Sequence, residues 1–450
     1  GGAMSSLNLV DFVRGIAPTS YAVDSRLVQP GALFVALRGA QTDGHAFLQS
    51  AQSAGAVAAI VEEIVPADLP QFVVSDALEA LAELARLRLA DLKGVQVFGI
   101  TGTVGKTTAK DMLAHLLGGP PAQVHAAPAS YNSEIGLPLA ILSAPRDTQK
   151  LVLEFGISHA GDMSPLTAIV NPAIVWFTAL TQVHLDGFNS FKELIAEKTK
   201  LMHGQVPPEY IWGEPSVLDA VREAIPNDCV KERVLNLCER SLQGLPGEWQ
   251  LNLAPFGLVD LPVVAYHEAV LAATAASIAL DVGIALTEIR ARLNSLPRPS
   301  GRLEWHKMGT ISILNDAYNA SPASMRAALE VLAQCPTQGR RIAVLGTMRE
   351  MGDAALSLHQ EIGRFAATLS LDLIVGIGDF AEAYVSPSRA AGTQVFLASD
   401  VDEFTKTFAP QLRQHDFLLL KASRAEAFEK SLPELKASAN HLAQRPETTT

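Results

Sequence analysis

A glycine-rich segment with a lysine and two threonines is the part of the chain best suited to bind phosphate. The segment GITGTVGKTTAK covers Gly99–Lys110 and follows the apolar run Val95–Phe98. A strand, a glycine-rich turn and a helix that starts at Lys-Thr place bare N–H groups and a positive helix end around a polyphosphate. Lys106 would reach its β- and γ-phosphates, and the Thr107 hydroxyl would face Mg²⁺. Ile100 replaces the first glycine of the full Walker pattern. The alternative is a turn that binds nothing, but such a turn has no need of Lys-Thr-Thr.

Two polar residues follow apolar strands close to this loop. Glu154 lies near the end of Leu151–Phe155, where a charge is costly unless it is paired or bound to metal, so we expect a magnesium ligand rather than a structural ion pair. His184 follows Ala173–Leu180, at the carboxyl end where parallel sheets bind ligands; an ordinary polar residue is the alternative. The helix expected next, at Phe191–Met202, carries three lysines that by pattern alone form a solvated face: Lys192, Lys198 and Lys200.

The region before the loop alternates short strands with Ala/Leu-rich helices. Ala32–Leu37 reads as a strand, and Ala46–Ala54 and Ala77–Leu92 read as helices. The turns Asp24-Ser25-Arg26 and Asp43-Gly44-His45 lie between them. Local turn chemistry explains both, and the alternative is a polar rim that holds part of a substrate.

The last third of the chain follows a predicted linker and repeats a strand-turn-helix order. The linker is Pro297–Arg302, and a helix at Pro322–Ala333 has Ser321 as its N-cap. The expected strands are Ile311–Leu314, Ile342–Leu345, Leu373–Ile377 and Phe417–Lys421. This order predicts a doubly wound domain that caps a ligand held by the middle domain. Residues 203–265 contain no motif that we could interpret.

Composition limits the class of protein. At 450 residues, with 48% hydrophobic and 18% charged residues, two to three α/β domains with large cores are expected. The net charge of −12 argues against nucleic acid or an anionic membrane as the main partner. Cys229, Cys238 and Cys335 have no metal-site spacing and predict free thiols in a reducing compartment. With no apolar run of about 20 residues, a cytoplasmic protein is expected.

With these pieces in order, the chain resembles the Mur ligase family of ATP-dependent amide-forming enzymes in peptidoglycan precursor synthesis. The matching strings, in family order, are VDSR, PGALFVALRG, DGHAFL, TGTVGKTT, YNSEIGLP, LEFG, HLDGF, GRLE, NDAYNASPASMRAAL, LGTMREMG and KASRAEAFE. The resemblance implies an α/β fold of three domains. These are a small UDP-binding domain (1–92), a central P-loop-type ATPase domain with a mostly parallel sheet (93–298), and a C-terminal Rossmann-like domain (299–450). The last domain would close over ATP and bind the incoming amine.

The resemblance also implies the cofactors ATP and Mg²⁺, and it assigns residues to them. Those that would contact the triphosphate are Gly102, Thr103, Gly105, Lys106, Thr107, Thr108 and Asn132. Those that would hold Mg²⁺ are Thr107, Glu154, His184 and Lys198, the last as a carbamate formed with CO2. From the last domain, Arg302 would reach the γ-phosphate, Asp316 the ribose, and Asn319 the nucleotide or dipeptide side. Those that would face the substrates are Ser25, Arg26, Asp43, His45, Lys421, Ser423 and Arg424. Lys106, Lys198 and Arg302 would be the catalytic set.

Within the family, YNASP followed by SMRAAL resembles the member that adds D-Ala-D-Ala to UDP-MurNAc-tripeptide through an acyl phosphate. The implied partners are these small molecules, without nucleic acid or membrane, and a monomer is expected. Three residues depart from the family pattern. Glu268 stands where the family has an asparagine that contacts adenine, Thr347 replaces an aspartate, and Ala422 replaces a glycine. Two alternatives stay open. One is a Mur-type ligase for another acid and amine, including a third-residue-adding one, and the other is a non-catalytic nucleotide-binding paralogue.

Overall fold

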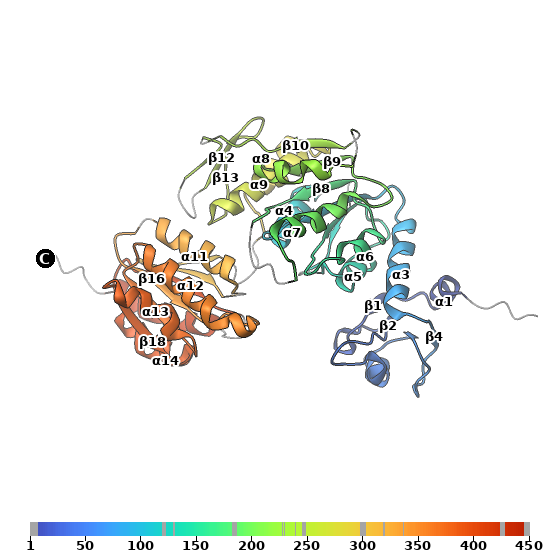
Figure 1. Ribbon diagram of the computed structural model, residues 1–450, viewed down its shortest axis with the longest axis horizontal. Helices are drawn as coiled ribbons and strands as arrows, with labels where there is room; N and C mark the ends of the chain where they lie inside the picture. Colours follow the sequence, from blue (N-terminus) through green and yellow to red (C-terminus); the bar gives the residue numbers. More distant parts are fainter. Residues whose placement is uncertain are drawn as a thin grey trace, which may run out of the picture. The chain divides into compact units, whose positions relative to one another are not determined.

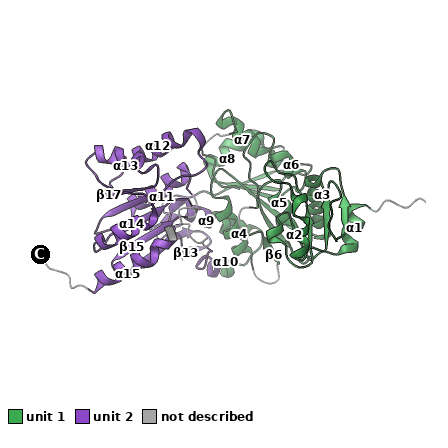
Figure 2. Cartoon of the chain, turned by 90° about the horizontal axis from the view of Figure 1, so that it is seen from below, with its two compact units in different colours: residues 1–236, 274–289 green, residues 237–273, 290–450 purple. Residues whose placement is uncertain are grey.

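The structure is a computed structural model that describes residues 8–118, 123–128, 131–181, 187–226, 228, 230–238, 240–244, 249–297, 303–317, 320–335, 337–423 and 428–444. The chain forms two compact units, coloured separately in Figure 2. The first contains residues 1–236 and 274–289, and the second contains residues 237–273 and 290–450. Both units are α/β, as the sequence predicts.

The first unit begins with a four-stranded parallel sheet in the order β1-β2-β3-β4 (Figure 1). The strands are β1 (Ser20–Ala22), β2 (Ala32–Val35), β3 (Ala58–Val61) and β4 (Gln71–Val73). Every residue of β2 and β3 is buried. The helical segments are α1 (Leu9–Ile16), η1 (Ser25–Leu27), η2 (Gly44–Phe47), α2 (Leu48–Ser53) and α3 (Ala77–Asp91). The helix expected at 46–54 therefore starts as a 3-10 turn.

The second sheet of this unit carries the glycine-rich loop. It has six parallel strands in the order β10-β9-β8-β5-β7-β6. They are β5 (Gln96–Thr101), β6 (Val124–Ala126), β7 (Lys150–Glu154), β8 (Ile174–Phe177), β9 (Tyr210–Gly213) and β10 (Lys231–Val234). The helical segments are α4 (Lys106–Leu117), α5 (Gly136–Leu142), α6 (Met163–Thr167), α7 (Phe191–Thr199), η3 (Lys200–Met202), α8 (Pro215–Val221) and η4 (Arg222–Ala224). Part of the uninterpreted stretch 203–265 thus forms one edge of the sheet.

One continuous apolar core joins the two sheets of the first unit. It includes Leu33 and Ile60 of the small sheet, Leu84 of α3, and Leu151 and Leu153 of β7, all of which are buried. Helix α3 connects the two sheets along the chain (Figure 1). The chain passes from one unit to the other at three points: one follows residue 236, and the other two lie within the helices α9 (Tyr266–Asp281) and α10 (Leu286–Leu293).

The second unit is built on a six-stranded sheet in the order β14-β15-β19-β16-β17-β18. The strands are β14 (Glu304–Met308), β15 (Ile311–Asp316), β16 (Arg341–Leu345), β17 (Leu373–Ile377), β18 (Gln394–Ala398) and β19 (Phe417–Lys421). All pairings are parallel except that of β14 with β15. The four predicted strands are confirmed. The two edge strands, β14 and β18, were not predicted. Most residues of both strands are only partly buried or exposed. The sequence of β14 lacks a clear apolar pattern, whereas the apolar run Val395–Ala398 of β18 was overlooked.

The remaining elements of the second unit are helices and a small antiparallel sheet. That sheet comprises β11 (Leu242–Gln243), β12 (Gln250–Leu253) and β13 (Gly257–Asp260). The helical segments are α11 (Pro322–Gln334), η5 (Gly352–Ala354), α12 (Ala355–Thr368), α13 (Ala381–Ala390), α14 (Val401–Phe408), η6 (Ala409–Gln411), η8 (Phe428–Ser431) and α15 (Leu432–Ala443). Ser321 caps α11, as predicted, and shares a capping box with Ser324.

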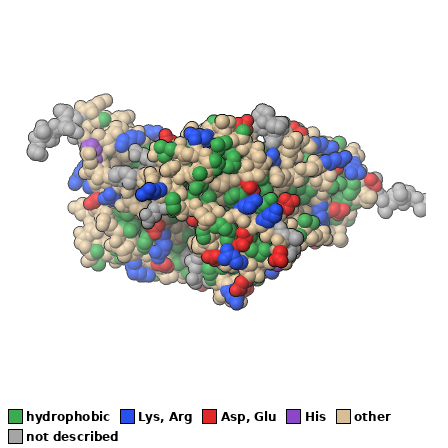
Figure 3. All heavy atoms as spheres, turned by 90° about the horizontal axis from the view of Figure 1, so that it is seen from above, with side chains coloured by type: hydrophobic (Ala, Val, Ile, Leu, Met, Phe, Trp, Pro, Cys, Tyr) green, Lys and Arg blue, Asp and Glu red, His purple; other side chains and the backbone are tan. Residues whose placement is uncertain are grey.

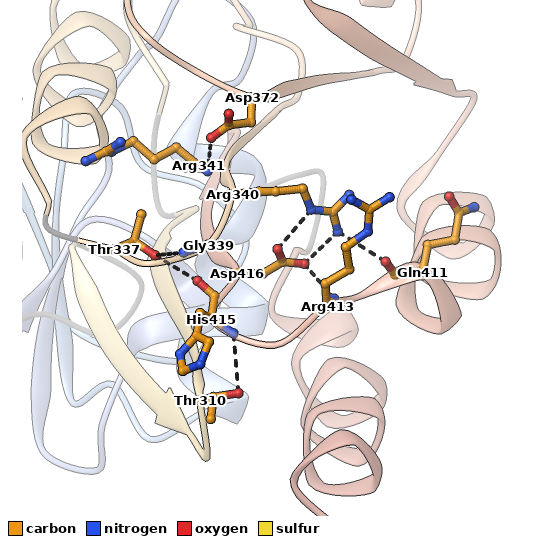
Figure 4. Close-up of polar contacts among 10 residues, drawn as sticks. All are labelled: Thr310, Thr337, Gly339, Arg340, Arg341, Asp372, Gln411, Arg413, His415 and Asp416. Atoms are coloured by element: carbon orange, nitrogen blue, oxygen red, sulfur yellow. Dashed lines mark hydrogen bonds and ion pairs between the residues drawn. The ribbon is translucent and has the colours of Figure 1, made fainter. Parts of the chain in front are cut away.

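A polar network fixes the amino ends of β16 and β19 (Figure 4). The buried carboxylate of Asp416 accepts hydrogen bonds from Arg340 Nε (2.9 Å), Arg340 Nη2 (2.7 Å) and the Arg413 backbone N–H (2.7 Å). The Thr337 hydroxyl donates to the His415 carbonyl oxygen at 2.7 Å. Because these contacts hold adjacent strands in register, the carboxyl ends of the same strands are also held side by side.

The surface and the cysteines agree with the composition. On the face shown in Figure 3, acidic and basic side chains are interspersed with apolar ones. Cys238 and Cys335 are free thiols, as predicted, whereas Cys229 lies outside the described residues. No helix in the described part of the chain combines the length and apolar character needed to cross a membrane.

Candidate functional site

The glycine-rich loop connects β5 to α4 and is held by the neighbouring strand β8. Gly102 and Gly105 have positive φ angles of 157° and 83°. A Cβ on Gly102 would lie 2.1 Å from the Thr178 hydroxyl, so that position requires glycine. The same hydroxyl donates to the Val104 carbonyl oxygen at 2.7 Å, and the Thr103 N–H donates to the Ala179 carbonyl oxygen at 2.8 Å. These contacts fix the loop backbone in the open form that phosphate binding needs.

Two lysines from different helices converge on this loop. Lys106, at the start of α4, and Lys198, on α7, both donate to the carbonyl oxygen of Gly102, at 3.0 and 2.9 Å. Lys198 is only 2% exposed. Burial, and then the charge of Lys106, lower the pKa of Lys198 to about 7. Burial also lowers the pKa of Lys106, against the opposing effect of the Glu154 carboxylate.

A buried carboxylate completes this cluster. Glu154 is 3% exposed and ends β7, which pairs directly with β5. Its oxygens accept hydrogen bonds from the Thr107 hydroxyl, at 3.1 Å to each, and from Asn132 Nδ2 at 2.9 Å. Gly156 makes room for Asn132, since a Cβ there would lie 2.6 Å from the Asn132 side chain. Within the described contacts no lysine or arginine forms an ion pair with Glu154. The structure therefore brings together five of the residues named in the sequence analysis: Lys106, Thr107, Asn132, Glu154 and Lys198.

Glu197 is a residue of this site that the sequence analysis missed. Its carboxylate is 2% exposed, accepts a hydrogen bond from the Met163 N–H at 2.9 Å, and pairs with Lys200 at 2.5 Å. Burial raises the pKa of Glu197, but the hydrogen bonds from Lys200, Met163 and Gly161 outweigh it and leave that pKa lowered. Lys200, predicted to be merely solvated, thus anchors a buried acid. Glu197 ties α7, and with it Lys198, to the start of α6.

The predicted substrate residues of the small sheet cluster after its strands. Asp24 caps η1 and binds Arg26 through Nε (3.0 Å) and Nη2 (2.7 Å), next to Ser25. Asp43 accepts from the N–H and Nδ1 of His45, at 2.9 and 2.7 Å. The Nε2 of His45 accepts from the Glu62 N–H at 2.9 Å, which fixes the neutral tautomer with its proton on Nδ1. Both turns therefore have the local turn chemistry that was one of the two interpretations.

In the second unit, Asp316 and Lys421 form a buried ion pair across adjacent strands. Lys421 Nζ lies 2.9 Å from Asp316 Oδ2, and the Leu303 N–H donates to Asp316 Oδ1 at 3.0 Å. Burial raises the pKa of Asp316, against the opposing effect of Lys421. Ser423 lies just beyond β19, and its buried hydroxyl oxygen has no hydrogen-bond partner among the described residues. Asp316 and Lys421 both lie at the carboxyl ends of their strands, β15 and β19.

The three departures from the family pattern lie in the second unit. The Glu268 carboxylate accepts from the N–H groups of Val264 (3.2 Å) and Ala265 (3.1 Å), where it caps the start of α9. Ala422 is fully buried after β19, and Thr347 follows β16. Four predicted site residues lie outside the described part of the chain: His184, Arg302, Asn319 and Arg424.

Comparison with known proteins assigns the family. The "Mur ligase middle domain" profile matches residues 100–234, "Mur ligase, glutamate ligase domain" matches 301–424, and "Mur ligase family, catalytic domain" matches 19–89. A UDP-N-acetylmuramoyl-tripeptide–D-alanyl-D-alanine ligase of Mycobacterium bovis is 31% identical over 94% of this chain and 93% of its own.

Two solved structures agree with that comparison. MurF from Acinetobacter baumannii superposes with a TM-score of 0.81 at 27% identity, over 93% of this chain and 94% of its own. MurF ligase from Thermotoga maritima in complex with ADP has a TM-score of 0.77 at 26% identity, over 95% and 99%. The motifs, the fold and these similarities lead to one conclusion: the chain belongs to the Mur ligase family, with its N-terminal, middle and C-terminal domains.

Proposed function

We propose that the protein is an ATP-dependent ligase that joins D-Ala-D-Ala to UDP-MurNAc-tripeptide in peptidoglycan precursor synthesis. The relative from Mycobacterium bovis carries that name over nearly the whole of both chains, and the Thermotoga maritima relative is described in complex with ADP. The observation that carries the proposal is the convergence of Lys106, Lys198, Thr107 and Glu154 on one phosphate-binding loop.

The cluster around Glu154 fits Mg²⁺. The Glu154 carboxylate is buried and accepts hydrogen bonds from two neutral side chains, Thr107 and Asn132, so its described hydrogen bonds supply no counter-charge and a bound cation would be favoured there. Carboxylate and hydroxyl oxygens are the donors that magnesium prefers. Thr107 and Glu154 would hold one ion, and His184 with carbamylated Lys198 would hold a second. Bound magnesium would offset the charge on the phosphates.

The reaction would proceed in two displacements. A carboxylate oxygen of the tripeptide attacks the γ-phosphorus of ATP, the bond to the ADP oxygen breaks, and an acyl phosphate forms. The dipeptide amine then attacks the acyl carbon, the bond to the phosphate oxygen breaks, and the nitrogen loses a proton. Lys106 would exchange its hydrogen bond to Gly102 for phosphate oxygens. Backbone groups of Thr103 and Thr108, and the Asn132 side chain, would orient the same phosphates.

Lys198 is suited to carbamate formation because CO2 adds only to a neutral amine. A pKa of about 7 leaves a large neutral fraction of Lys198 near neutral pH, whereas an exposed lysine has almost none. Carbamylation would convert a cationic donor into a carboxylate beside the loop. It would also remove the repulsion between Lys198 and Lys106.

The other assignments follow the family pattern. Arg302 would reach the γ-phosphate when the C-terminal domain closes, with a hinge near Pro297–Gly301, and Asp316 and Asn319 would contact the nucleotide. The proposed substrate contacts are Ser25, Arg26, Asp43 and His45 on the UDP-linked side, and Lys421, Ser423 and Arg424 on the other. The domains would be 1–92, 93–298 and 299–450. We propose a monomer that acts in the cytoplasm, where ATP is available.

The decisive experiment is phosphate release from ATP with UDP-MurNAc-tripeptide, in the presence and absence of D-Ala-D-Ala. We expect release that requires both substrates, together with a pentapeptide product by mass spectrometry. Lys106→Met should abolish release, whereas Lys192→Met, at an exposed position of α7, should leave it unchanged. Release that depends on neither substrate, or a complete lack of release, would contradict the proposal. Release with a different amine only would favour a ligase of altered specificity.

A further inference from the structure

A cavity in the first unit lies between β1, α3 and the segment that leads from α5 to β7. Its volume is about 540 Å³, within the range of about 300–1,000 Å³ that is typical of small-molecule sites. The residues that line it are Pro18, Thr19, Ser20, Tyr21, Arg88, Leu139, Leu142, Ser143, Ala144, Pro145 and Arg146. None of these residues has a role in the proposed ligation.

Arg88 is held rigidly at this cavity. Its Nη1 donates to the carbonyl oxygens of Leu142 at 3.0 Å and Ala144 at 2.8 Å, and its guanidinium carbon lies 5.9 Å from the ring centre of Tyr21. No ion pair between Arg88 and a carboxylate is found in the described part of the chain. The hydrogen-bond partners of Arg88 are neutral acceptors, so an anion in the cavity would add a favourable charge-charge interaction with the guanidinium.

Two other arginines of the same unit, unlike Arg88, form ion pairs with carboxylates. Arg86, two residues earlier on α3, pairs with Glu79, and Arg38 pairs with Glu63. Arg146, an exposed residue that also lines the cavity, forms no ion pair within the described residues. Two cationic side chains without carboxylate partners therefore line one cavity, in a chain whose net charge is −12.

Neutral polar groups accompany the two arginines. The hydroxyl oxygen of Ser20 is buried and has no hydrogen-bond partner among the residues described. Burial raises the pKa of Tyr21, against opposing effects of Arg88 and Arg146, so its hydroxyl stays protonated and can donate. The charge of Asp91 also raises the pKa of Tyr21. Asp91 forms no ion pair with Arg88 or Arg146 in the described contacts.

We propose that this cavity binds a small organic oxyanion: a phosphate or carboxylate carried on an apolar body. Arg88 and Arg146 would donate charge-assisted hydrogen bonds to the oxyanion, and Tyr21 and Ser20 would donate neutral ones. Leu139, with the other apolar residues of the lining, would contact the body of the ligand.

This site is separate from the phosphate loop. Arg146 precedes β7 and Glu154 ends it, and a strand of five residues spans about 17 Å. Helix α5 connects the two regions, since it begins shortly after Asn132 and ends with Leu142 at the cavity. ATP at the loop would therefore not compete directly for the cavity.

The test is calorimetric titration of the full chain with phenyl phosphate, benzoate and neutral phenol, each with a non-hydrolysable ATP analogue already saturating the loop. We expect at least one of the two anions to bind at millimolar concentration, and phenol to bind at least about tenfold more weakly. The tighter anion identifies the oxyanion class.

Three variants make the test specific. Arg88→Gln and Arg146→Gln should each weaken anion binding about tenfold or more, a loss of about 1.4 kcal/mol. Arg146→Gln is the safer variant, because Arg88 also bonds two backbone carbonyls. Arg86→Gln, on the same helix, is the matched control and should leave binding unchanged. Absence of binding by both anions, equal binding of phenol, or binding insensitive to Arg146→Gln would overturn the proposal.

Discussion

Lys106 and Lys198 share one hydrogen-bond acceptor, the carbonyl oxygen of Gly102, at 3.0 and 2.9 Å. Burial, and then the charge of Lys106, lower the pKa of Lys198 to about 7. Two lysines therefore converge on the phosphate-binding loop, and Lys198, which reaches it from α7, is the one suited to lose a proton.

Lys198→Ala is expected to reduce turnover by at least about 100-fold, the effect of removing a group that stabilises developing charge. ATP affinity should change little, because Lys106 and the loop backbone remain. Phosphate release and ATP titration measure the two effects. Added formate or acetate should restore part of the turnover if a carboxylate is what the site lacks. Unchanged turnover would remove the carbamate role.

Glu154→Gln tests the proposed magnesium site. The amide keeps the size of the side chain but removes the charge that favours Mg²⁺, so turnover should fall by about 100-fold or more. The Mg²⁺ concentration needed for half-maximal ATP binding should rise as well. Glu209→Gln, at an exposed residue before β9, is the control and should behave like the wild type. A variant with normal magnesium dependence would rule out Glu154 as a ligand.

Glu197→Gln tests whether Glu197 positions Lys198. The amide cannot match the carboxylate that accepts the Met163 N–H and pairs with Lys200, so α7 should be held less firmly. We expect kcat to fall about tenfold, the size typical of outer-shell changes, with little change in ATP affinity. The requirement for added bicarbonate should increase, an effect that simple loss of stability would not produce. Lys200→Met, which removes only the exposed partner, should have a smaller effect.

His359 gives the second unit a pH-dependent stability. Its buried Nε2 accepts from the Met348 N–H at 3.0 Å, and its Nδ1 donates to the Ala355 carbonyl oxygen at 2.6 Å. Burial lowers the pKa of His359, against the opposing effect of the bond to Ala355. The unfolded chain therefore binds the proton more readily than the folded one.

The stabilisation from neutral His359 is fully present above the unfolded pKa of about 6.5 and is lost as the pH falls below it. Urea unfolding of the wild type should therefore show a lower free energy of unfolding at acid pH than at neutral pH. His359→Gln should show a smaller change over the same range. Equal changes in both proteins would show that His359 does not contribute.

The candidate site was predictable where its residues lie in contiguous motifs. The loop from Gly102 to Thr107 and the strand that ends at Glu154 have local patterns that require a nearby ligand. Glu197 was not predictable, because a Glu-Lys pair three residues apart on a helix looks the same whether its acid is exposed or buried. The acid is buried only because the start of α6 lies against it.

The parts of the fold that sequence reasoning missed depend on distant neighbours. The edge strand β14 has partly exposed residues, and neither a continuous apolar run nor strict alternation marks it. The edge strand β18 does contain an apolar run, Val395–Ala398, which sequence reasoning overlooked. In the sequence, His45 has two interpretations, local turn chemistry and part of a polar rim that holds a substrate. In the structure the His45 ring links its own turn to the residue after β3, because it hydrogen-bonds to the Asp43 carboxylate and to the Glu62 N–H. Only the folded sheet brings those two partners together.

The chain alternates between its two compact units, since residues 237–273 belong to the second and residues 274–289 to the first. During synthesis, the unit that holds the phosphate loop cannot be complete until residue 289 has left the ribosome. By then residues 237–273 of the second unit have been synthesised, but they cannot complete their fold until residues 290–450 follow. Neither unit is therefore available as a single uninterrupted fragment, and a gene split at residue 236 would yield an ATP-binding half that lacks part of its own structure.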